Sequence, residues 1–307
     1  MYHRFNENKY PSTNTQIPIF KEHIQMIKSS GFEFLNPKLL SEFFYIEKPE
    51  KKFLLTIDDG YSSFYKHAWP YLLENEVPFL IFISTEAVGK NGYMDWEQIK
   101  EIEKFDFVNI GNHSHSHDYL INFDFKDFEK DIEKSIKIFN QKLGYNPKFF
   151  SYPFGEWDLK QKKFISQNFE FAFGQHSGVI DLNKDRYELP RFPINEKYGD
   201  LERFKFLVNL LPFQYKKVEP EEKIIDNNNP PKMIVEFFQN QNIKNMNCFS
   251  NEGDGWDKSK LIIKNNILTV NFRDKFKNRR GRINCSINDN DGWRWFGVQF
   301  VQKNIKE

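Results

Sequence analysis

The feature that most constrains the fold is an alternation of short apolar runs with helical patterns between residues 53 and 168. Apolar runs of strand length lie at Phe53–Ile57, Phe79–Ile83, Phe107–Ile110 and Phe149–Tyr152. A helical spacing of apolar residues follows each run, at 61–74, 96–104, 125–143 and 159–168. Nearly continuous apolar runs are typical of parallel strands that are covered on both faces. The alternation therefore predicts an α/β fold, either a barrel or a doubly wound sheet.

The pattern of the chain changes near residue 217. Residues 217–231 are charged, rich in asparagine and contain proline, which predicts a linker. Beyond them, strand-like segments separated by Asn, Asp and Gly turns lie at 233–238, 261–264, 267–272, 282–287 and 293–301. We therefore expect an α/β domain over residues 1–216 and a small all-β sandwich over residues 232–307.

Charge and hydropathy exclude several classes of partner. Lys and Arg number 44 against 43 Asp and Glu, so no overall basic field exists to hold a nucleic acid or an anionic membrane. The longest apolar runs, such as Val77–Ser84, are far shorter than the ~20 residues of a membrane span. The N-terminus lacks the charged and then apolar pattern of an export signal. We expect a protein without a membrane span and without a nucleic-acid partner.

Two polar clusters directly follow predicted strands. Asp58 and Asp59 end the first run, where Gly60 permits a break in the strand, so one carboxylate can bind an ion while its neighbour stays free. His113 and His117 follow the third run and are four residues apart, so on a helical turn they would share a face. An acidic pair at a strand end can also be a simple turn or cap. One carboxylate and two histidines with open positions are the ligand set expected of a hydrolytic metal centre.

The residues of these clusters resemble the motifs of a known family. Residues 56–60 (TIDDG) resemble the T-F-D-D-G motif, and residues 113–117 (HSHSH) match the H-[S/T]-x-x-H motif, of polysaccharide deacetylases with a NodB homology domain, carbohydrate esterase family 4. Residues 150–155 (FSYPFG) look like the family's third segment, without the arginine found there in many peptidoglycan and chitin deacetylases. Residues 1–4 (MYHR) are similar to the start of the branch that acts on biofilm poly-N-acetylglucosamine. The resemblance implies a NodB-type distorted (β/α) barrel.

The resemblance also implies roles for individual residues. Asp59, His113 and His117 would bind a divalent ion, usually zinc, and Asp58 would be the general base. His3 would be the general acid, as in the branch whose first strand ends in Tyr-His.

Three other residues have competing interpretations. His176 is a rival for the role of the acid. Arg191 would replace the missing arginine beside the base, or else form a buried structural ion pair. His115, which would point away from the other two histidines, is expected to be structural or exposed.

Aromatic residues at strand ends are candidates for contacts with a sugar. Tyr152, Pro153, Phe154 and Trp96 form the expected substrate-binding set, and core packing is the alternative for each ring. In the C-terminal part, Trp293 and Trp295 are two apart on a predicted strand and could form a glycan platform or belong to a sandwich core. The oxygen-rich run at 288–291 is best explained as a solvated turn.

Two properties of the chain are left with open alternatives. Cys248 and Cys285 could form a disulfide or remain two buried thiols. Only two residues precede His3, which is short for a strand, so a native start further upstream is one alternative. That start would bring an export signal and a cell-envelope or periplasmic location, whereas the chain as given would be cytoplasmic.

The sequence therefore predicts a metal-dependent hydrolase that removes N-acetyl groups from an acetylated amino sugar in a polysaccharide. The expected partner is an N-acetylated polysaccharide or oligosaccharide, and the expected cofactor is a divalent metal ion, zinc above others. One alternative keeps the site and makes the enzyme an O-acetyl esterase on a glycan. The other is a catalytically inactive protein that binds glycans through the β domain.

Overall fold

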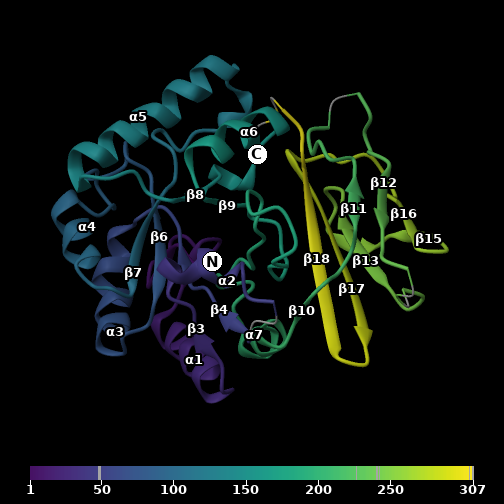
Figure 1. Ribbon diagram of the computed structural model, residues 1–307, viewed down its shortest axis with the longest axis horizontal. Helices are drawn as coiled ribbons and strands as arrows, with labels where there is room; N and C mark the ends of the chain where they lie inside the picture. The colour runs from purple at the N-terminus through teal and green to yellow at the C-terminus, as the bar shows by residue number, and fades with distance from the viewer. Residues whose placement is uncertain (48–49, 226, 240, 242, 304, 306–307) are drawn as a thin grey trace.

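The computed structural model describes residues 1–47, 50–225, 227–239, 241, 243–303 and 305 (Figure 1). The α-helices are α1 (Ile17–Ser29), α2 (Leu40–Phe43), α3 (Trp69–Glu74), α4 (Trp96–Glu103), α5 (Phe125–Leu143), α6 (Leu159–Asn168) and α7 (Leu201–Val208). Shorter helical turns are η1 (Pro37–Leu39), η2 (Phe64–Ala68), η3 (Leu120–Asn122) and η4 (Pro153–Gly155). The strands of the N-terminal part are β1 (Arg4–Phe5), β2 (Asn14–Thr15), β3 (Glu33–Phe34), β4 (Lys52–Phe53), β5 (Thr56–Ile57), β6 (Phe79–Ile83), β7 (Val108–Asn112), β8 (Phe149–Ser151) and β9 (Phe171–Phe173).

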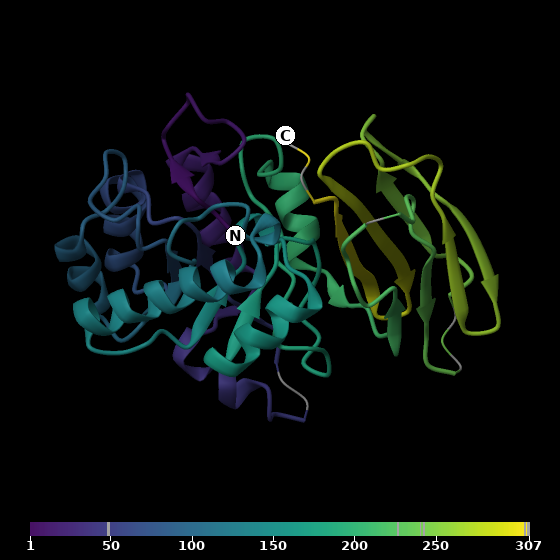
Figure 2. The same ribbon diagram turned by 90° about the horizontal axis from the view of Figure 1, so that it is seen from above.

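A five-stranded parallel sheet forms the centre of the N-terminal part, in the order β5-β6-β7-β8-β9. Strands β6, β7 and β8 coincide with predicted apolar runs, whereas the run Phe53–Ile57 is divided between β4 of another sheet and β5, and β9 was not predicted. All five residues of β6 are buried, as expected of a strand covered on both faces. Helices α3, α4 and α5 lie outside this sheet (Figures 1 and 2). The expectation of an α/β fold with a parallel sheet is confirmed.

The sheet curls, and short bridges extend it at both edges. Tyr2 pairs with Ile57 of β5 at one edge, and Leu189 pairs with Phe173 of β9 at the other. The amide of Ile194 donates to the carbonyl of Met1 at 3.0 Å, so the segment after residue 189 returns to the first edge. The result is an incomplete, distorted barrel, in agreement with the expected (β/α) fold.

Helix α5 illustrates how the sequence defines the outer layer. The side chain of Asp124 accepts a hydrogen bond from the amide of Asp127 and caps the helix start. Gly144, with φ 86°, ends the helix in the left-handed conformation that glycine tolerates. Phe128 and Ile132 lie four residues apart and are buried against the sheet side, as an amphipathic pattern requires.

The segment 61–74, expected as one helix, is divided. Residues Phe64–Ala68 form a π-type turn, η2, and α3 begins only at Trp69. Pro70 stands in the first turn of α3 and has no amide hydrogen, so a regular α-helical ladder cannot pass through it.

Two sheets make up the C-terminal part. Their strands are β10 (Leu211–Pro212), β11 (Lys217–Glu219), β12 (Met233–Glu236), β13 (Asn247–Asn251), β14 (Trp256–Lys258), β15 (Lys260–Lys264), β16 (Ile267–Asn271), β17 (Arg280–Asp289) and β18 (Gly292–Val301). One sheet has the order β10-β18-β17-β13-β14, and the other has the order β11-β12-β16-β15. Buried side chains from both sheets, among them Val235, Leu268 and Ile283, form one hydrophobic cluster. The long strands β17 and β18 lie next to the α/β part, with the four-stranded sheet beyond them (Figure 1).

The structure differs from the sequence-based expectation in two places here. Strands β13 and β14 were not predicted, because their residues are mostly polar and only Cys248 and Ser250 of β13 are buried. The segment 217–231, expected as a linker, starts with β11, which pairs with β12. Its residue Ile225 donates its amide to the carbonyl of Val301 at 2.8 Å, so this segment also adds to the β structure.

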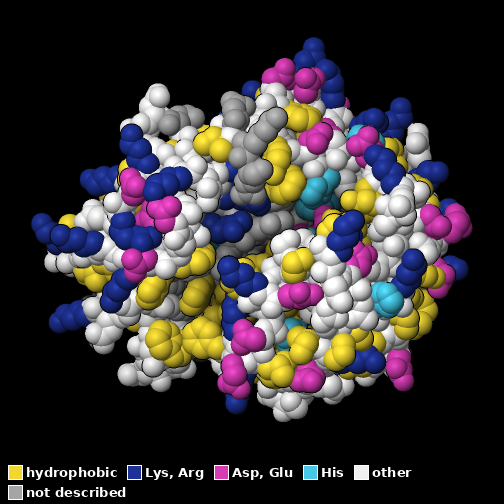
Figure 3. Space-filling view, turned by 180° about the vertical axis from the view of Figure 1, so that it is seen from behind, with side chains coloured by type: hydrophobic (Ala, Val, Ile, Leu, Met, Phe, Trp, Pro, Cys, Tyr) yellow, Lys and Arg dark blue, Asp and Glu magenta, His cyan; other side chains and the backbone are white. Residues whose placement is uncertain are grey.

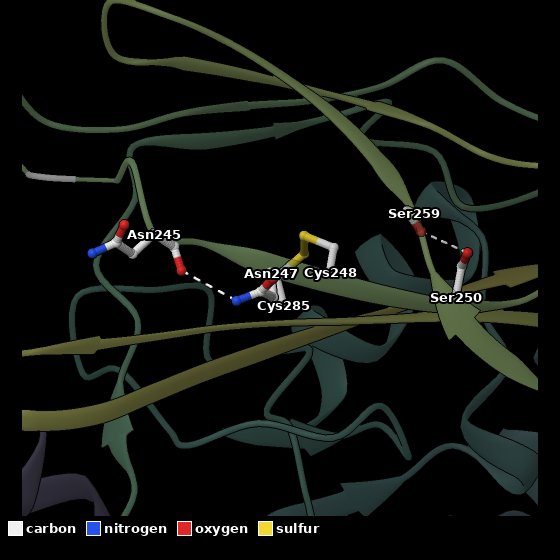
Figure 4. Close-up of a disulfide and its surroundings, with 6 residues drawn as sticks. All are labelled: Asn245, Asn247, Cys248, Ser250, Ser259 and Cys285. Carbon is white, nitrogen blue, oxygen red and sulfur yellow. Dashed lines mark hydrogen bonds between the residues drawn. A yellow bond between two sulfur atoms is a disulfide. The ribbon is translucent and has the colours of Figure 1, made fainter.

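Cys248 and Cys285 form a disulfide between directly paired residues of β13 and β17 (Figure 4). Of the two alternatives left open by the sequence, the structure therefore has the bridged form. Near it, the hydroxyl groups of Ser250 and Ser259 are hydrogen bonded at 2.7 Å.

The remaining predicted features of this part are accounted for by local contacts. The run 288–291 covers the end of β17 and the turn to β18, and Arg294 pairs with Asp289 and Asp291. Trp293 and Trp295 both pack on Phe206 of α7. The centroids of their rings lie 5.8 and 6.3 Å, respectively, from the centroid of the Phe206 ring. These two rings therefore join β18 to the α/β part.

Acidic and basic side chains are interspersed over the face seen in Figure 3, as the near-zero net charge suggests. Among the described residues, no helix has both the length and the apolar character needed to cross a membrane.

Candidate active site

The two polar clusters of the sequence meet at one edge of the parallel sheet. Asp58 and Asp59 directly follow β5, and His113 directly follows β7. The carboxyl ends of parallel strands lie at the same edge, so these side chains converge there. Asp58 and His113 are fully buried, and Asp59 is 8% exposed.

A sharp backbone turn after β5 separates the side chains of the two aspartates. Asp59 has φ 74° and Gly60 has φ 69°, which is left-handed backbone in consecutive residues. A side chain at Gly60 would lie 2.6 Å from Ile83 Cδ1, so glycine is required for space as well as for conformation. The turn directs the two carboxylates to different partners, as the sequence suggested.

The histidine segment after β7 is not a helical turn, and this expectation is wrong. Ser114 and His117 both have left-handed backbone, with φ 67° and 55°. The Ser114 hydroxyl accepts a hydrogen bond from the amide of His117 at 3.0 Å. The carboxylate of Asp131 on α5 accepts hydrogen bonds from the backbone amides of His115 and Ser116, at 2.8 and 3.0 Å. This loop, and not a helix, brings the histidine rings to one side.

Asp59, His113 and His117 form a group that could hold a metal ion. Oδ1 of Asp59 lies 3.3 Å from Nε2 of His113 and 3.1 Å from Nε2 of His117. The three ligand atoms lie within 4.8 Å of one another. Nδ1 of His113 lies 2.7 Å from the carbonyl oxygen of Ser151, to which it donates, so Nε2 carries the lone pair.

The donor atoms at this position fit a divalent cation. Oδ1 of Asp59 and Nε2 of His113 are buried and make no hydrogen bond, which is costly unless another partner binds them. One carboxylate oxygen and two imidazole nitrogens are ligands that zinc and related ions accept. The orphaned atoms and the donor set therefore agree.

Arg191 holds Asp58 through two parallel hydrogen bonds. Nη1 donates to Oδ1 at 2.6 Å and Nη2 donates to Oδ2 at 2.8 Å. Nη2 also donates to the Ser151 hydroxyl at 2.8 Å, and Nε donates to the Gly174 carbonyl at 2.9 Å. Burial opposes ionisation of Asp58, but the guanidinium group keeps the pKa of Asp58 below its usual value.

The two candidate acids lie in different surroundings. His3 is close enough to the site for the charges of Asp59 and Asp58 to act on it. Burial lowers the pKa of His3, and the two carboxylates oppose that effect. His176 instead lines a small cavity with Lys184, Glu188 and other residues at the border of the C-terminal part.

The set of charged groups that shifts the pKa of His176 differs from the set that acts on His3. Burial, and then Lys223 and Arg191, lower the pKa of His176 to about 4. The charges of Asp58 and Asp59 thus act on the pKa of His3 and are not among the causes that shift the pKa of His176.

The four expected substrate contacts have different environments. Tyr152 is 1% exposed and donates its hydroxyl to the Tyr187 carbonyl at 3.1 Å, which makes it a core residue. Pro153 is also buried. Trp96 packs edge-on against Phe139 of α5, at a centroid distance of 5.9 Å. Tyr152 and Pro153 therefore offer little surface to a sugar, whereas Trp96 is partly buried and packs against the core.

Phe154 differs from the other three because it lies beside the site. Its ring packs against His117 at a centroid distance of 4.9 Å, and it is only partly buried. Of the expected set, it is the residue that the structure brings to the metal-ligand group.

Reasoning from the sequence missed Asp131 and Ser151, which position the histidines. Asp131 is a buried acid on α5, and Ser151 is the last residue of β8. An acidic residue on the apolar face of a predicted helix is the one sequence signal that could have indicated Asp131. Ser151 lies within the family's third segment but carries no such signal.

The fold is a curled parallel sheet with helices outside it, and the candidate site places carboxylates and histidines at the strand ends. This combination is typical of a class of metal-dependent hydrolases. Residues 45–168 match the family model described as polysaccharide deacetylase, and this range contains Asp58, Asp59, His113 and His117. Residues 45–168 therefore carry a match to a polysaccharide deacetylase domain, which indicates a hydrolase.

Individual relatives agree with the family. The Bacillus subtilis protein YxkH, whose name describes a polysaccharide deacetylase, is 24% identical over 64% of this chain and 70% of the relative. A poly-beta-1,6-N-acetyl-D-glucosamine N-deacetylase of Escherichia coli is 22% identical over 53% of this chain, but this region is only 31% of that protein. The structure of IcaB from Ammonifex degensii superposes with a TM-score of 0.59 at 23% identity, over 67% of this chain and 94% of the other. The structural likeness supports the fold.

Proposed function

We propose that this protein is a metal-dependent hydrolase that removes N-acetyl groups from an acetylated amino sugar in a polysaccharide. The observation that carries the proposal is the pairing of two carboxylates with separate partners at one strand end. Asp59 faces His113 and His117, whereas Asp58 is held by Arg191. One aspartate can therefore bind an ion while the other remains a base.

The cation that we propose at Asp59, His113 and His117 is zinc. When bound, such an ion supplies a Lewis acid that polarises an acetamide oxygen and lowers the pKa of water. The carboxylate oxygen and the two Nε2 atoms would hold it, and the hydrogen bond from His113 to the Ser151 carbonyl fixes the direction of one ring.

Asp58 is the proposed general base. Its carboxylate is ionised at neutral pH, because Arg191 offsets the cost of burial. In this state it can accept the proton of the attacking water. Arg191 donates to both oxygens, so it fixes the plane of the carboxylate for that transfer.

His3 is the proposed general acid. Amide hydrolysis releases an amine, which is a poor leaving group until a proton reaches its nitrogen. Burial lowers the pKa of His3, and the charges of Asp59 and Asp58 offset part of that effect. His176 lacks such carboxylates among the groups that shift its pKa.

The substrate class is inferred from relatives and from the site. The names of the curated relatives describe enzymes that act on acetylated glucosamine polymers or on polysaccharides. Phe154, partly exposed beside His117, offers a ring on which a sugar could stack. A polymer of N-acetylglucosamine is the substrate that we propose to test first.

The test is acetate release from N-acetylglucosamine oligomers by the purified full chain with added Zn²⁺. We expect the wild type to release acetate together with an equal amount of free amine, and Asp58→Asn to release none. Acetate without amine, from an O-acetylated glycan, would assign the esterase instead. If wild type releases acetate from neither kind of glycan, the proposed function is wrong.

A further inference from the structure

The turn that carries Phe154 has an unfavourable backbone conformation. Phe154 and Gly155 have φ 59° and 67°, and a phenylalanine rarely adopts such a value. Conformations of this kind persist only where surrounding contacts hold them, and they often occur at functional sites. Side chains of the C-terminal strands contribute contacts that hold this turn.

Gln299 of β18 binds the turn through its side-chain amide. Its Nε2 donates to the carbonyls of Phe154 and Gly155 at 3.1 and 3.0 Å, and the side chain is buried. Its Oε1 accepts a hydrogen bond from Nε of Arg282 at 2.9 Å, which fixes the orientation of the amide. Two consecutive carbonyls thus share one donor group that lies more than 140 residues away in the sequence.

Arg279, just before β17, holds the residue that follows the turn. It forms hydrogen bonds of 2.6–3.0 Å with both carboxylate oxygens of Glu156. The side chains are 0% and 1% exposed. Arg279 also donates to the carbonyl of Ile305 at 3.0 Å. A buried, bidentate pair of this kind fixes the distance between the C-terminal strands and the turn.

A stack of planar groups continues from Arg279 to the proposed metal ligand. The guanidinium carbon of Arg279 lies 4.0 Å from the centre of the Tyr119 ring. Tyr119 stacks on Phe154 at 4.2 Å and 24°, and Phe154 meets His117 edge-on at 4.9 Å. Each group limits the movement of the next, because the separations are those of direct contact.

We propose that Gln299 and Arg279 are positioning residues for His117, acting through the Phe154 turn. The inference rests on the proposed role of His117 as a metal ligand, and it assigns to the C-terminal strands a part in ion binding. Contacts behind a metal ligand orient it, and their loss typically weakens metal affinity by about 10- to 100-fold.

Gln299→Glu in the full chain is the sharpest variant. The new carboxylate retains an acceptor for Arg282 and nearly the same volume, but it offers the two carbonyls no N–H donor. The matched control is Lys303→Met, which removes the contact of Lys303 with Asp158 at 3.2 Å. That contact also joins the end of β18 to the α/β part, but it reaches the start of α6 and not the Phe154 turn.

The readout is Co²⁺ binding, followed by calorimetry and by the visible absorption of the bound ion. We expect Gln299→Glu to raise the dissociation constant by about 10-fold and to change the spectrum. Lys303→Met should change neither. Equal affinity and an unchanged spectrum in both variants would overturn the proposal.

Phe154→Leu decides the question if Gln299→Glu does not fold. Leucine retains an apolar side chain but breaks the stack between Tyr119 and His117, so the same loss of affinity is expected. Unchanged Co²⁺ affinity in a folded Phe154→Leu protein would overturn the proposal.

Hydrogen exchange separates this inference from the proposed function. In metal-free protein, exchange over residues 113–119 should be faster in Gln299→Glu than in Lys303→Met. That comparison stands even if wild type binds no ion or releases no acetate, results that would refute the proposed function alone. Equal exchange in the two variants would refute the positioning role.

Discussion

Replacing Arg191 with methionine tests whether Asp58 depends on a single cation. The substitution removes the two hydrogen bonds to Asp58, at 2.6 and 2.8 Å, and those to Ser151 and Gly174. Methionine fills similar space without polar atoms. Asp58 then remains buried with its charge unpaired.

The loss of stability can be estimated from burial. The side chains of Arg191 and Asp58 are 4% and 0% exposed. Removing one partner of a buried pair costs about 3–5 kcal/mol of unfolding free energy. At about 2–4 °C per kcal/mol for large domains, Tm should fall by on the order of 10 °C. Arg191→Met with Asp58→Asn should lose less than the sum of the single changes, since no lone charge remains.

The pH dependence has a definite sign. In wild type, Arg191 lowers the pKa of Asp58, so the stability from this carboxylate is present above its unfolded pKa and is lost as the pH falls from that value through the lowered one. Without Arg191, burial dominates and should raise the pKa of Asp58 above the unfolded value. The variant then regains stability as the pH falls from 7 toward about 4.5, where Asp58 takes up a proton. The Tm gap between wild type and variant should narrow over that range.

The assay is thermal unfolding from pH 7 to pH 4.5 in the presence of a chelator, so that no ion contributes. Arg191→Lys serves as the control, because it keeps the charge and loses the paired geometry. We expect its Tm gap to be smaller and nearly independent of pH. A gap of constant size for Arg191→Met, or effects that add within about 0.5 kcal/mol in the double variant, would refute the reasoning.

Three further predictions concern the histidines and the ion. His113→Ala should abolish Zn²⁺ binding in calorimetry because it removes a ligand atom, whereas His115→Ala, whose ring bonds to Thr85, should retain it. His3→Gln should lower kcat for acetate release by about 100-fold or more, and His176→Gln should leave kcat nearly unchanged. Equal losses of kcat in His3→Gln and His176→Gln would contradict the assignment of His3 as the general acid. A chelator should stop acetate release and added Zn²⁺ should restore it, so full activity in metal-free protein would contradict the ligand assignment.

The parallel sheet could be predicted because strands that are buried on both faces are apolar at nearly every position. The run at β6 is apolar at every position, and the structure buries every position. Strands β13 and β14 have no such pattern, since β13 buries only Cys248 and Ser250 and β14 is exposed at every position. Their pairing depends on the neighbouring strand β17, which no local pattern reveals.

The site could be predicted only in part for a similar reason. Motif residues that follow strands reach one edge of the sheet by topology, so Asp59 and His113 could be placed there from the sequence. The contacts of Asp131 with the histidine loop, and of Ser151 with His113, join residues from separate elements. Such contacts arise from tertiary packing, and a single sequence does not encode them as a pattern.

The junction between the two parts bears on how the protein should be divided for experiments. The sequence suggested a catalytic part over 1–216 joined by a linker to an accessory sandwich, which would allow each to be studied alone. A chain cut at 216 would remove Arg279, the buried ion-pair partner of Glu156. It would also remove the donor that holds Phe154 and Gly155. Low activity of such a fragment would therefore report on the lost contacts, and a test of the enzyme requires the full chain.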